Sequence, residues 1–379
     1  MRIAMLVSAA FPPREGMGFY VWNLSRYLVR QGHTVHIITR GGARSTACDI
    51  TEGITIWRPA FLPVYPFHVD LHGLYINKLI RRLETGIDIL HVHSPLSPVI
   101  STTRPIMLTF HSMVTEDVNR TQINDFYTLL MKLQAPVSFR LESGNLKRAK
   151  SVNAVSPLIA RDLRRYPNCP PKIEVSWNGV DVESFKPLAT GITNEKLVIT
   201  VGRLAPGKGL EDLIDAASIV VKSDQEIKFQ IVGEGTLRPS LLNRVREYGL
   251  ENNVRLTGQI SDRPSLIDLY QKSALFVLPS HHEGLPTVVL EAMACACPVL
   301  ATRVGGIPWI IQDGENGSLI PPADPTILAE KILALLADPE YLKQLGRQAR
   351  RTIESRFSWQ CIGDWYIDQY RSLLAGGLN

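Results

Sequence analysis

Short apolar runs alternate with amphipathic stretches along the first half of the chain. Each run is bounded by polar residues, glycine or proline, which is typical of strands in a parallel sheet that is buried on both faces. After the first run, Val21, Leu24 and Leu28 recur at helical spacing, and Gly32 follows where that helix is expected to end. The pattern predicts strands at residues 3–7, 34–38, 54–57, 87–92, 105–109 and 151–155.

A second alternation of the same kind begins at Leu197. The segment before it, residues 188–196, has little apolar content, and we interpret it as a linker between domains. The pattern predicts strands at residues 197–201, 227–232, 254–257, 275–278 and 298–301. Helices are expected to begin near Gly209, Leu237, Arg263, Pro286 and Pro325, and amphipathic helices fill the chain from Pro339 onward.

The repeated order of strand and helix predicts two doubly wound α/β domains, residues 1–187 and 188–356. Ligands of such sheets bind outside the carboxyl ends of the strands. We therefore expect a ligand site in a cleft between the two domains.

Composition indicates an ordinary globular protein of 379 residues, with 45% hydrophobic and 20% charged residues. A net charge of +5 suits an anionic small ligand or an acidic membrane surface, and we expect no nucleic-acid partner. Five cysteines form no disulfide framework, and the first apolar run is too short for a signal peptide. No apolar run approaches the roughly 20 residues that cross a bilayer, so we expect a cytoplasmic protein.

The stretch from Ser280 to Thr302 carries the strongest chemical signal. It follows an apolar strand, begins with a polar loop that holds Glu283, and continues into a helix that Pro286 is expected to open. Free N–H groups and the positive end of the helix dipole make such a loop an anion site. Glu283 and Glu291 flank it, and buried carboxylates there need partners, for which neutral sugar hydroxyls would serve.

Three other loops of the second half follow predicted strands. Residues 202–209 hold Arg203 and Lys208 among three glycines, which suits close approach to a diphosphate; the alternative is a solvated basic loop. The other two loops contain Gly233 and the pair Gln259 and Ile260, and they could cradle a base and ribose or be ordinary turns.

The first half offers weaker candidates. Residues 15–18 lack the full dinucleotide fingerprint, so they are either a glycine loop that closes over phosphate or a plain turn. His111 stands at a strand end, as a site residue or a structural one. His91 and His93 alternate onto one strand face, but a metal site would need a third ligand that we cannot identify. Cys295 and Cys297 lack a second pair at metal-binding spacing, so we expect them to be small buried residues at the end of a helix.

Taken together, these residues resemble the retaining GT-B glycosyltransferases of glycosyltransferase family four over nearly the whole chain. The strongest element is the pair of glutamates in EGLPTVVLEAMACACPVLAT, residues 283–302. The other matching motifs are VGRLAPGKG at 201–209, SWNGVDVESF at 176–185, QGHTV at 31–35, HVHS at 91–94, TFH at 109–111 and the first glycine loop.

The resemblance implies a fold and a set of roles. The fold would be two Rossmann-like domains, with the acceptor on the first, the nucleotide sugar on the second, and a C-terminal helix at 357–379 that packs back on the first. Arg203 and Lys208 would bind the diphosphate, and His111 would approach the transferred sugar. The other donor-binding residues would be Gly16, Met17, Gly233, Gln259, Ile260, Glu283, Gly284, Leu285, Pro286, Thr287 and Glu291.

The resemblance also implies a reaction. A hexosyl unit would move from a nucleotide-diphosphate sugar, with UDP-glucose or UDP-N-acetylglucosamine favoured, to a saccharide or lipid-linked acceptor. The anomeric configuration would be retained, with no metal and no cofactor. One departure is Glu15, which stands where the family usually has a glycine; it could contact the acceptor or turn outward.

Two alternatives remain open for the reaction. A nucleotide-sugar epimerase of the same fold would need no acceptor, and a catalytically silent sugar-nucleotide-binding subunit would consume no donor. Basic clusters near Lys78, Lys147 and Arg161 could touch anionic lipid in a peripheral membrane contact, or be solvated helix faces. The oligomeric state is not predicted.

Overall fold

A computed structural model of the protein describes residues 1–13, 16–43, 46–113, 126–188 and 194–376, apart from the side chains of residues 126–133 and 194–195. It divides the chain into two compact units, of which the first is Met1–Asn178 with Ile362–Asn379 and the second is Gly179–Cys361. Each unit is a sheet of mainly parallel strands with helices packed on it, so the predicted fold class is confirmed.

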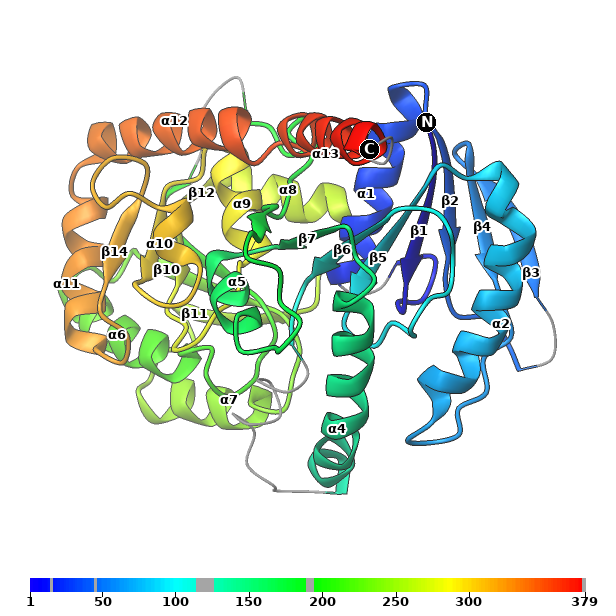
Figure 1. The fold of residues 1–379 in the computed structure, drawn as a ribbon. Coiled ribbons are helices and arrows are strands. Elements are labelled where there is room, and N and C mark those ends of the chain that lie inside the picture. Colours follow the sequence, from blue (N-terminus) through cyan, green and yellow to red (C-terminus); the bar gives the residue numbers. More distant parts are fainter. Residues whose placement is uncertain (14–15, 44–45, 114–125, 189–193, 377–379) are drawn as a thin grey trace. The chain divides into compact units, whose positions relative to one another are not determined.

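The first unit contains an eight-stranded sheet in the order β3-β4-β2-β1-β5-β6-β7-β8 (Figure 1). All of its pairs are parallel except β3 with β4. The chain reverses its direction of winding between β1 and β5, which makes that point the topological switch of the sheet. The strands are β1 (Arg2–Val7), β2 (Thr34–Ile38), β3 (Ala47–Thr51), β4 (Ile54–Arg58), β5 (Ile89–Ser94), β6 (Ile106–Phe110), β7 (Ser151–Ala154) and β8 (Glu174–Val175).

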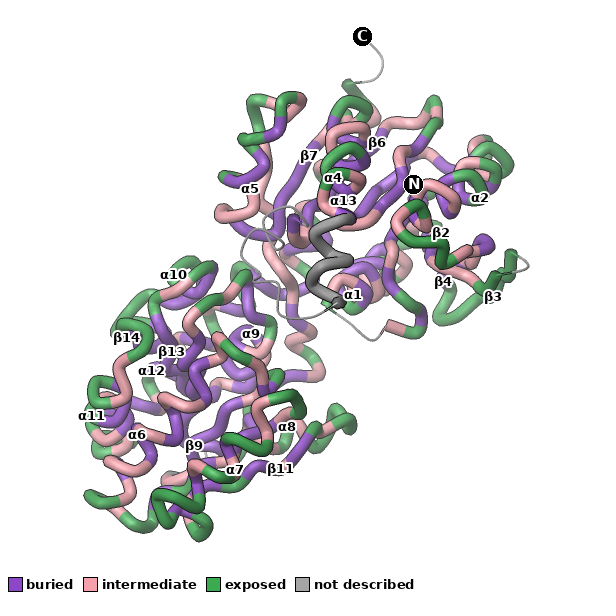
Figure 2. Tube along the Cα trace, turned by 90° about the horizontal axis from the view of Figure 1, so that it is seen from below, coloured by how far each residue is buried: buried purple, intermediate pink, exposed green. Residues whose placement is uncertain are grey.

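Alternate residues of the central strands face opposite sides of this sheet. Leu6 and Val92 pack in one hydrophobic cluster with Ile76 and Ile80 of α2. The other face of β5 carries His91 and His93, which lie against α1 and α13. Figure 2 shows the strands as largely buried and the helices as buried on one side only. The helices of this unit are α1 (Gly16–Arg30), α2 (His68–Leu83), η1 (Glu84–Gly86), α4 (Phe126–Leu146), α5 (Pro157–Leu163) and most of α13 (Trp359–Ala375).

The second unit contains a six-stranded sheet in the order β11-β10-β9-β12-β13-β14, and every pair in it is parallel. Its topological switch lies between β9 and β12, so the loops after these two strands open at neighbouring points of the carboxyl edge. The strands are β9 (Asn194–Val201), β10 (Lys228–Val232), β11 (Val254–Gly258), β12 (Ser273–Leu278), β13 (Val299–Thr302) and β14 (Ser318–Ile320).

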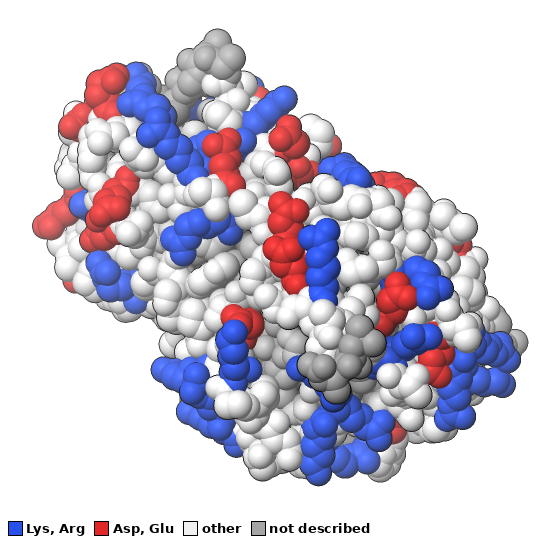
Figure 3. Space-filling model, turned by 45° about the horizontal axis from the view of Figure 1, so that its top comes forward, with Lys and Arg blue, Asp and Glu red and all other residues white. Residues whose placement is uncertain are grey.

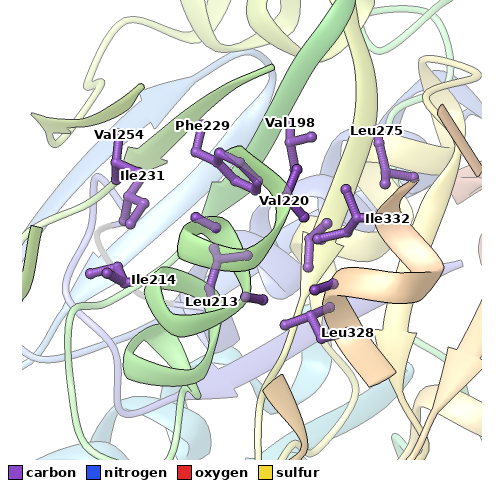
Figure 4. Packing of buried hydrophobic residues seen from close by; sticks show 14 of the residues in the cluster. Val198, Leu213, Ile214, Val220, Phe229, Ile231, Val254, Leu275, Leu328 and Ile332 are labelled. Atoms are coloured by element: carbon purple, nitrogen blue, oxygen red, sulfur yellow. The ribbon is translucent and has the colours of Figure 1, made fainter. Parts of the chain in front are cut away.

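One face of the second sheet carries the hydrophobic cluster drawn in Figure 4. Val198 and Phe229 of the strands meet Leu213 and Val220 of α6, while Ile332 of α11 closes the cluster. All five side chains are at most 2% exposed, so this cluster is a core rather than a surface patch. The helices are α6 (Leu210–Ser223), α7 (Arg238–Glu247), α8 (Arg263–Lys272), α9 (Thr287–Ala294), α10 (Ile307–Ile310), α11 (Pro325–Leu336) and α12 (Pro339–Arg356).

The boundaries of the units differ from the predicted 187 and 356. The N–H of Val180 donates to the carbonyl of Phe357 at 2.8 Å, and the buried ring of Phe185 lies 6.3 Å from that of Tyr270. The segment after Asn178 therefore packs within the second unit. The predicted linker at 188–196 is also corrected, because its last three residues belong to β9; residues 189–193 lie outside the described part.

Three strands were missed by the sequence pattern. All five residues of β3 are exposed, so they carry no apolar signal. β8 has two residues and β14 has three, which is too short for a periodic pattern. The remaining strands were placed within two residues at each end, except that β9 begins three residues earlier than predicted.

Candidate active site

Two loops meet at the switch point of the second sheet. The loop after β9 contains Gly207, whose carbonyl accepts the N–H of His281 in the loop after β12 at 2.8 Å. The ring Nε2 of His281 lies 2.6 Å from Oδ2 of Asp212 in α6. Gly209 has a φ of +63°, and a Cβ there would stand 2.0 Å from the carbonyl oxygen of Pro279. The backbone at this point is therefore packed too closely for any residue but glycine.

Lys208 and Glu283 are brought together by these two loops. Lys208 Nζ lies 2.7 Å from Glu283 Oε1, and the hydroxyl of Ser280 donates to the same oxygen at 2.7 Å. The side chain of Glu283 is 9% exposed and that of Lys208 is 27% exposed. A carboxylate so enclosed needs these partners, because an unpaired buried charge is costly. The two residues predicted to bind different parts of a donor are thus paired with each other.

Two adjacent glycines after β13, Gly305 and Gly306, fix the backbone around Glu283. Gly306 N–H donates to the carbonyl of Gly284 at 2.7 Å. Gly305 has a φ of +54°, and a Cβ on it would stand 1.7 Å from the carbonyl oxygen of Glu283. The segment after β13 therefore holds the Glu283 loop in place.

Helix α9 starts at Thr287, one residue later than predicted. Pro286 occupies the N-cap position with a φ of −71°, rather than the first helical position. The exposed Thr287 then begins the helix, and N–H groups of its first turn have no acceptor within the helix. Leu285, by contrast, is buried at 8% exposure and anchors the loop.

Glu291 stands one turn into α9 and is largely enclosed. The hydroxyl of Tyr270 donates to Glu291 Oε2 at 3.2 Å. Burial raises the pKa of Glu291 to about 7, while the Tyr270 hydrogen bond and the charge of Arg263 oppose that rise. The carboxyl group is therefore poised between its neutral and charged forms near neutral pH.

A cavity of about 250 Å³ opens beside these loops at the same carboxyl edge. The predicted residues Arg203, Gly233, Gln259 and Ile260 all line it. Gly233 has a φ of +145°, and its Cβ position would overlap the carbonyl oxygen of Gly202. Arg203 is exposed, so it is accessible to a ligand.

The first unit places three histidines in a row at its own carboxyl edge. His111, just after β6, has Nε2 3.0 Å from Nδ1 of His93. His91 has Nε2 2.7 Å from the hydroxyl of Thr109 and Nδ1 2.7 Å from that of Tyr370. Burial lowers the pKa of both His91 and His111 to about 3, so these rings are neutral at physiological pH.

Helix α13 contributes directly to this histidine cluster. The hydroxyl of Tyr366 lies 2.9 Å from that of Tyr20 in α1 and 3.2 Å from that of Thr109. The ring of Tyr20 meets the ring of His111 edge-on at 4.7 Å. The C-terminal helix thus holds groups that surround His111 within the first unit.

The remaining predicted residues lie at or near the ends of helices. Gly16 and Met17 form the first turn of α1, where Gly16 is exposed, and Glu15 lies outside the described residues. Cys295 and Cys297 are buried free thiols at the end of α9, as predicted. Burial raises the pKa of Cys295 to about 12, which makes it inert. No three His, Cys, Asp or Glu side chains converge as a metal site within the described ranges.

Several site residues were missed by sequence reasoning. Ser280 could have been found, because it stands three residues before Glu283 in one polar loop. Tyr270, Tyr366 and Gly305 are distant in sequence from the residues that they support. Only the fold brings them to the site.

Solved structures with the same fold include two that match nearly the whole chain. Sucrose-phosphate synthase from Thermosynechococcus elongatus has a TM-score of 0.80 with 24% identity, covering 99% of both chains. HepE of Anabaena, solved in complex with UDP, has a TM-score of 0.77 with 19% identity, covering 98% of this chain and 100% of its own. The fold is therefore that of the GT-B glycosyltransferases.

Sequence relatives and family models agree on the family. D-inositol 3-phosphate glycosyltransferase of Thermobispora bispora is 28% identical, over 95% of this chain and 90% of its own. Alpha-maltose-1-phosphate synthase of Mycobacterium tuberculosis is 29% identical, over 99% of this chain and 100% of its own. The model "Glycosyltransferase Family 4" matches residues 14–184, and "Glycosyl transferases group 1" matches residues 184–352. The two models together match residues 14–352, and the chain belongs to glycosyltransferase family 4, the group 1 glycosyl transferases.

Proposed function

We propose that this glycosyltransferase moves a hexosyl unit from a UDP-sugar to a hydroxyl of a saccharide or lipid-linked acceptor, with retention of configuration and without a metal. The observation that carries this proposal is the Lys208–Glu283 pair at the switch point of the second sheet. It supplies a cation for a diphosphate and a carboxylate for sugar hydroxyls. HepE of Anabaena, which has the same fold, has been solved in complex with UDP and with UDP-glucose, and this supports a UDP-sugar as the donor.

Donor binding would rearrange this pair. An incoming diphosphate would compete with Glu283 for Lys208, while sugar hydroxyls would replace Lys208 as donors to Glu283. Arg203 on the cavity wall would add a second cation, and N–H groups at the start of α9 would donate hydrogen bonds to phosphate oxygens. Glu291 would take hydrogen bonds from the ribose.

The barrier to transfer comes from breaking the bond between the sugar and the phosphate. Charge then develops on the leaving diphosphate, and each cation at about 4 Å is worth roughly 4 kcal/mol at an effective dielectric near 20. Lys208 and Arg203 can therefore stabilise the departing group more than a general base would. We propose that the acceptor hydroxyl attacks from the same face and that the departing phosphate takes its proton. His111 would contact the transferred sugar as a neutral ring.

The acceptor side could also include a membrane surface. No described helix is long and apolar enough to cross a bilayer. However, Leu74 and Tyr75 of α2 are exposed at 69% and 39%, and the exposed cations Lys78, Arg81 and Arg82 follow them on that helix. Such a face supports peripheral contact with anionic lipid. Elsewhere basic and acidic side chains are interspersed, as Figure 3 shows for one face.

One experiment tests the reaction. The protein would be incubated with a panel of nucleotide sugars, first alone and then with an acceptor library, and products would be followed by NMR with and without a chelator. We expect UDP release that depends on acceptor, an α-anomeric product from an α-linked donor, and no effect of the chelator. A new sugar epimer from donor alone would indicate an epimerase, and no donor consumption would indicate a silent subunit. Near wild-type turnover in a variant with both Arg203→Ala and Lys208→Ala would overturn the mechanism.

A further inference from the structure

A cluster of donor groups gathers at the carboxyl edge of the first sheet, apart from the histidines around His111. Arg40 follows β2, Phe61 follows β4, and His68 and His72 stand in the first turns of α2. The guanidinium of Arg40 lies over the Phe61 ring, 5.6 Å from its centroid. The rings of His72 and His68 meet Phe61 edge-on at 5.2 Å and 5.9 Å. These four residues form what we call the Arg40 cluster.

The backbone fixes the Arg40 cluster in place. Gly41 N–H donates to the carbonyl of Pro59 at 2.9 Å, and Phe61 N–H donates to the carbonyl of Gly42 at 3.1 Å. A Cβ on Gly41 would stand 2.4 Å from the carbonyl oxygen of Arg58, so only glycine fits there. The loop that holds Arg40 is thus tied to the loop that holds Phe61.

The cluster carries positive charge and unused donors. No described residue accepts a hydrogen bond from the Arg40 side chain or forms an ion pair with it. Asp70, whose charge acts on His68, is held by both oxygens to Arg140 at 2.6 and 2.7 Å. Burial lowers the pKa of His68 and His72, and the charge of Arg40 lowers both further. An anion placed here would therefore be attracted by Arg40 and opposed by no free carboxylate of the described chain.

His72 adds a second, independent observation. It is 2% exposed, and its Nε2 is enclosed with no hydrogen-bond partner among the described residues. Its other ring nitrogen bonds to the backbone of Pro59. The nitrogen that donates to a carbonyl is a protonated one, so a proton taken up on Nε2 would make His72 a second cation beside Arg40. His68 is oriented by the amide of Gln134, at 3.4 Å between the two nitrogens.

We propose that the Arg40 cluster binds a phosphate group of the acceptor, with Arg40 as a bidentate donor, His68 as a further donor, and His72 as a donor once its Nε2 has taken up a proton. A guanidinium matches two phosphate oxygens in one plane. The phosphate belongs to a sugar phosphate or to a lipid head group, since both present the same anion. This inference rests on the proposed transferase activity, because it assigns the acceptor side of the same reaction.

Direct binding tests the assignment without relying on transfer. Wild type, Arg40→Ala, Arg40→Lys and a matched control, Arg30→Ala at the exposed end of α1, would be titrated by calorimetry with glucose 1-phosphate, glucose, dihexanoyl phosphatidic acid and UDP. We expect Arg40→Ala to weaken phosphate-ligand binding about 10- to 100-fold, Arg40→Lys to weaken it less, and Arg30→Ala to leave it unchanged. UDP affinity should be the same in all four proteins.

Each outcome separates the candidate sources. Loss of glucose 1-phosphate binding in Arg40→Ala supports a sugar-phosphate acceptor, and loss of dihexanoyl phosphatidic acid binding alone supports a lipid phosphate. If neither phosphate ligand binds wild type, or if Arg40→Ala binds both as well as wild type, the inference is wrong. An equal fall in UDP affinity would assign the cluster to the donor and also overturn it. Absence of UDP binding in wild type would instead count against the proposed function.

Discussion

Lys208 Nζ lies 2.7 Å from Glu283 Oε1, so the cation expected for a diphosphate and the carboxylate expected for a sugar neutralise each other before a donor arrives. Their enclosure is unequal, because Glu283 is 9% exposed and Lys208 27%. Removing Lys208 therefore leaves a buried charge, whereas removing the charge of Glu283 releases a cation that water can still reach.

The first prediction uses this asymmetry. Glu283→Gln should lower turnover by at least about 100-fold, since the sugar loses its charged acceptor, but UDP should bind as tightly as to wild type or more tightly. Lys208→Met should weaken UDP binding and lower the free energy of unfolding by about 1–3 kcal/mol. Calorimetry with UDP and urea unfolding would measure both effects. Weaker UDP binding in Glu283→Gln would show that the pair does not compete with the donor.

The second prediction concerns the stability of the second unit against pH. Burial raises the pKa of Glu291 from 4.5 to about 7, so the unfolded chain releases this proton first as pH rises. Glu291 therefore contributes stability below about pH 4.5, and that contribution is lost as pH rises to about 7, by at most about 3 kcal/mol.

Urea unfolding across pH 4 to 8 would measure that slope, with Glu291→Gln as the variant that lacks the titrating group. The difference in unfolding free energy between Glu291→Gln and wild type should grow through this range. Tyr270→Phe should move the pH midpoint of this change upward, because the Tyr270 hydrogen bond lowers the pKa of Glu291. A difference that is flat with pH would contradict the shifted pKa.

The loops proposed to bind the nucleotide-sugar donor could be predicted from the sequence, because each is recognised from a short continuous stretch of residues. Arg203, Lys208 and Glu283 each lie in a loop that follows a buried strand, so strand ends and glycines were enough to place them on one edge. The pairing of Lys208 with Glu283 was not predictable, since it depends on loop conformations 75 residues apart. The contacts of Tyr366 and Tyr370 with His91 and Thr109 depend on how α13 packs, which periodicity does not encode.

The third prediction concerns Arg350 of α12, which ties three segments of the second unit together. Its guanidinium donates to the carbonyls of Phe185 at 2.6 Å, Ala294 at 2.7 Å and Val182 at 3.1 Å. The side chain is 15% exposed, so its removal leaves carbonyl groups without a hydrogen-bond donor at a place that water reaches poorly. Arg350→Met should lower the free energy of unfolding by about 2–4 kcal/mol.

A neighbouring arginine provides the control for this prediction. Arg351 is exposed on the same helix, and Arg351→Met should change the free energy of unfolding by less than about 0.5 kcal/mol. Urea unfolding followed by circular dichroism would compare the two variants with wild type. Similar unfolding midpoints for both variants would mean that the carbonyl contacts of Arg350 contribute little.

The last prediction assigns a proton in the pair His93–His111. Nδ1 of His93 and Nε2 of His111 lie 3.0 Å apart, and both rings have a pKa held well below the usual range by burial, so each carries one proton. If His111 donated, His93 would carry its proton on Nε2, which is enclosed without a partner among the described residues. An enclosed N–H without an acceptor is rarer than an enclosed lone pair without a donor.

His93 is therefore expected to donate from Nδ1, which leaves the proton of His111 on its own Nδ1. That proton makes His111 a donor toward a ligand rather than an acceptor. Two-bond ¹⁵N–¹H correlation spectra should show protonated Nδ1 in both rings, and His93→Phe should shift His111 toward a mixture of tautomers. If His111 acts on the transferred sugar through this donor, His93→Phe should lower kcat more than it raises the KM for the donor. A protonated Nε2 on His111 in wild type would reverse the assignment.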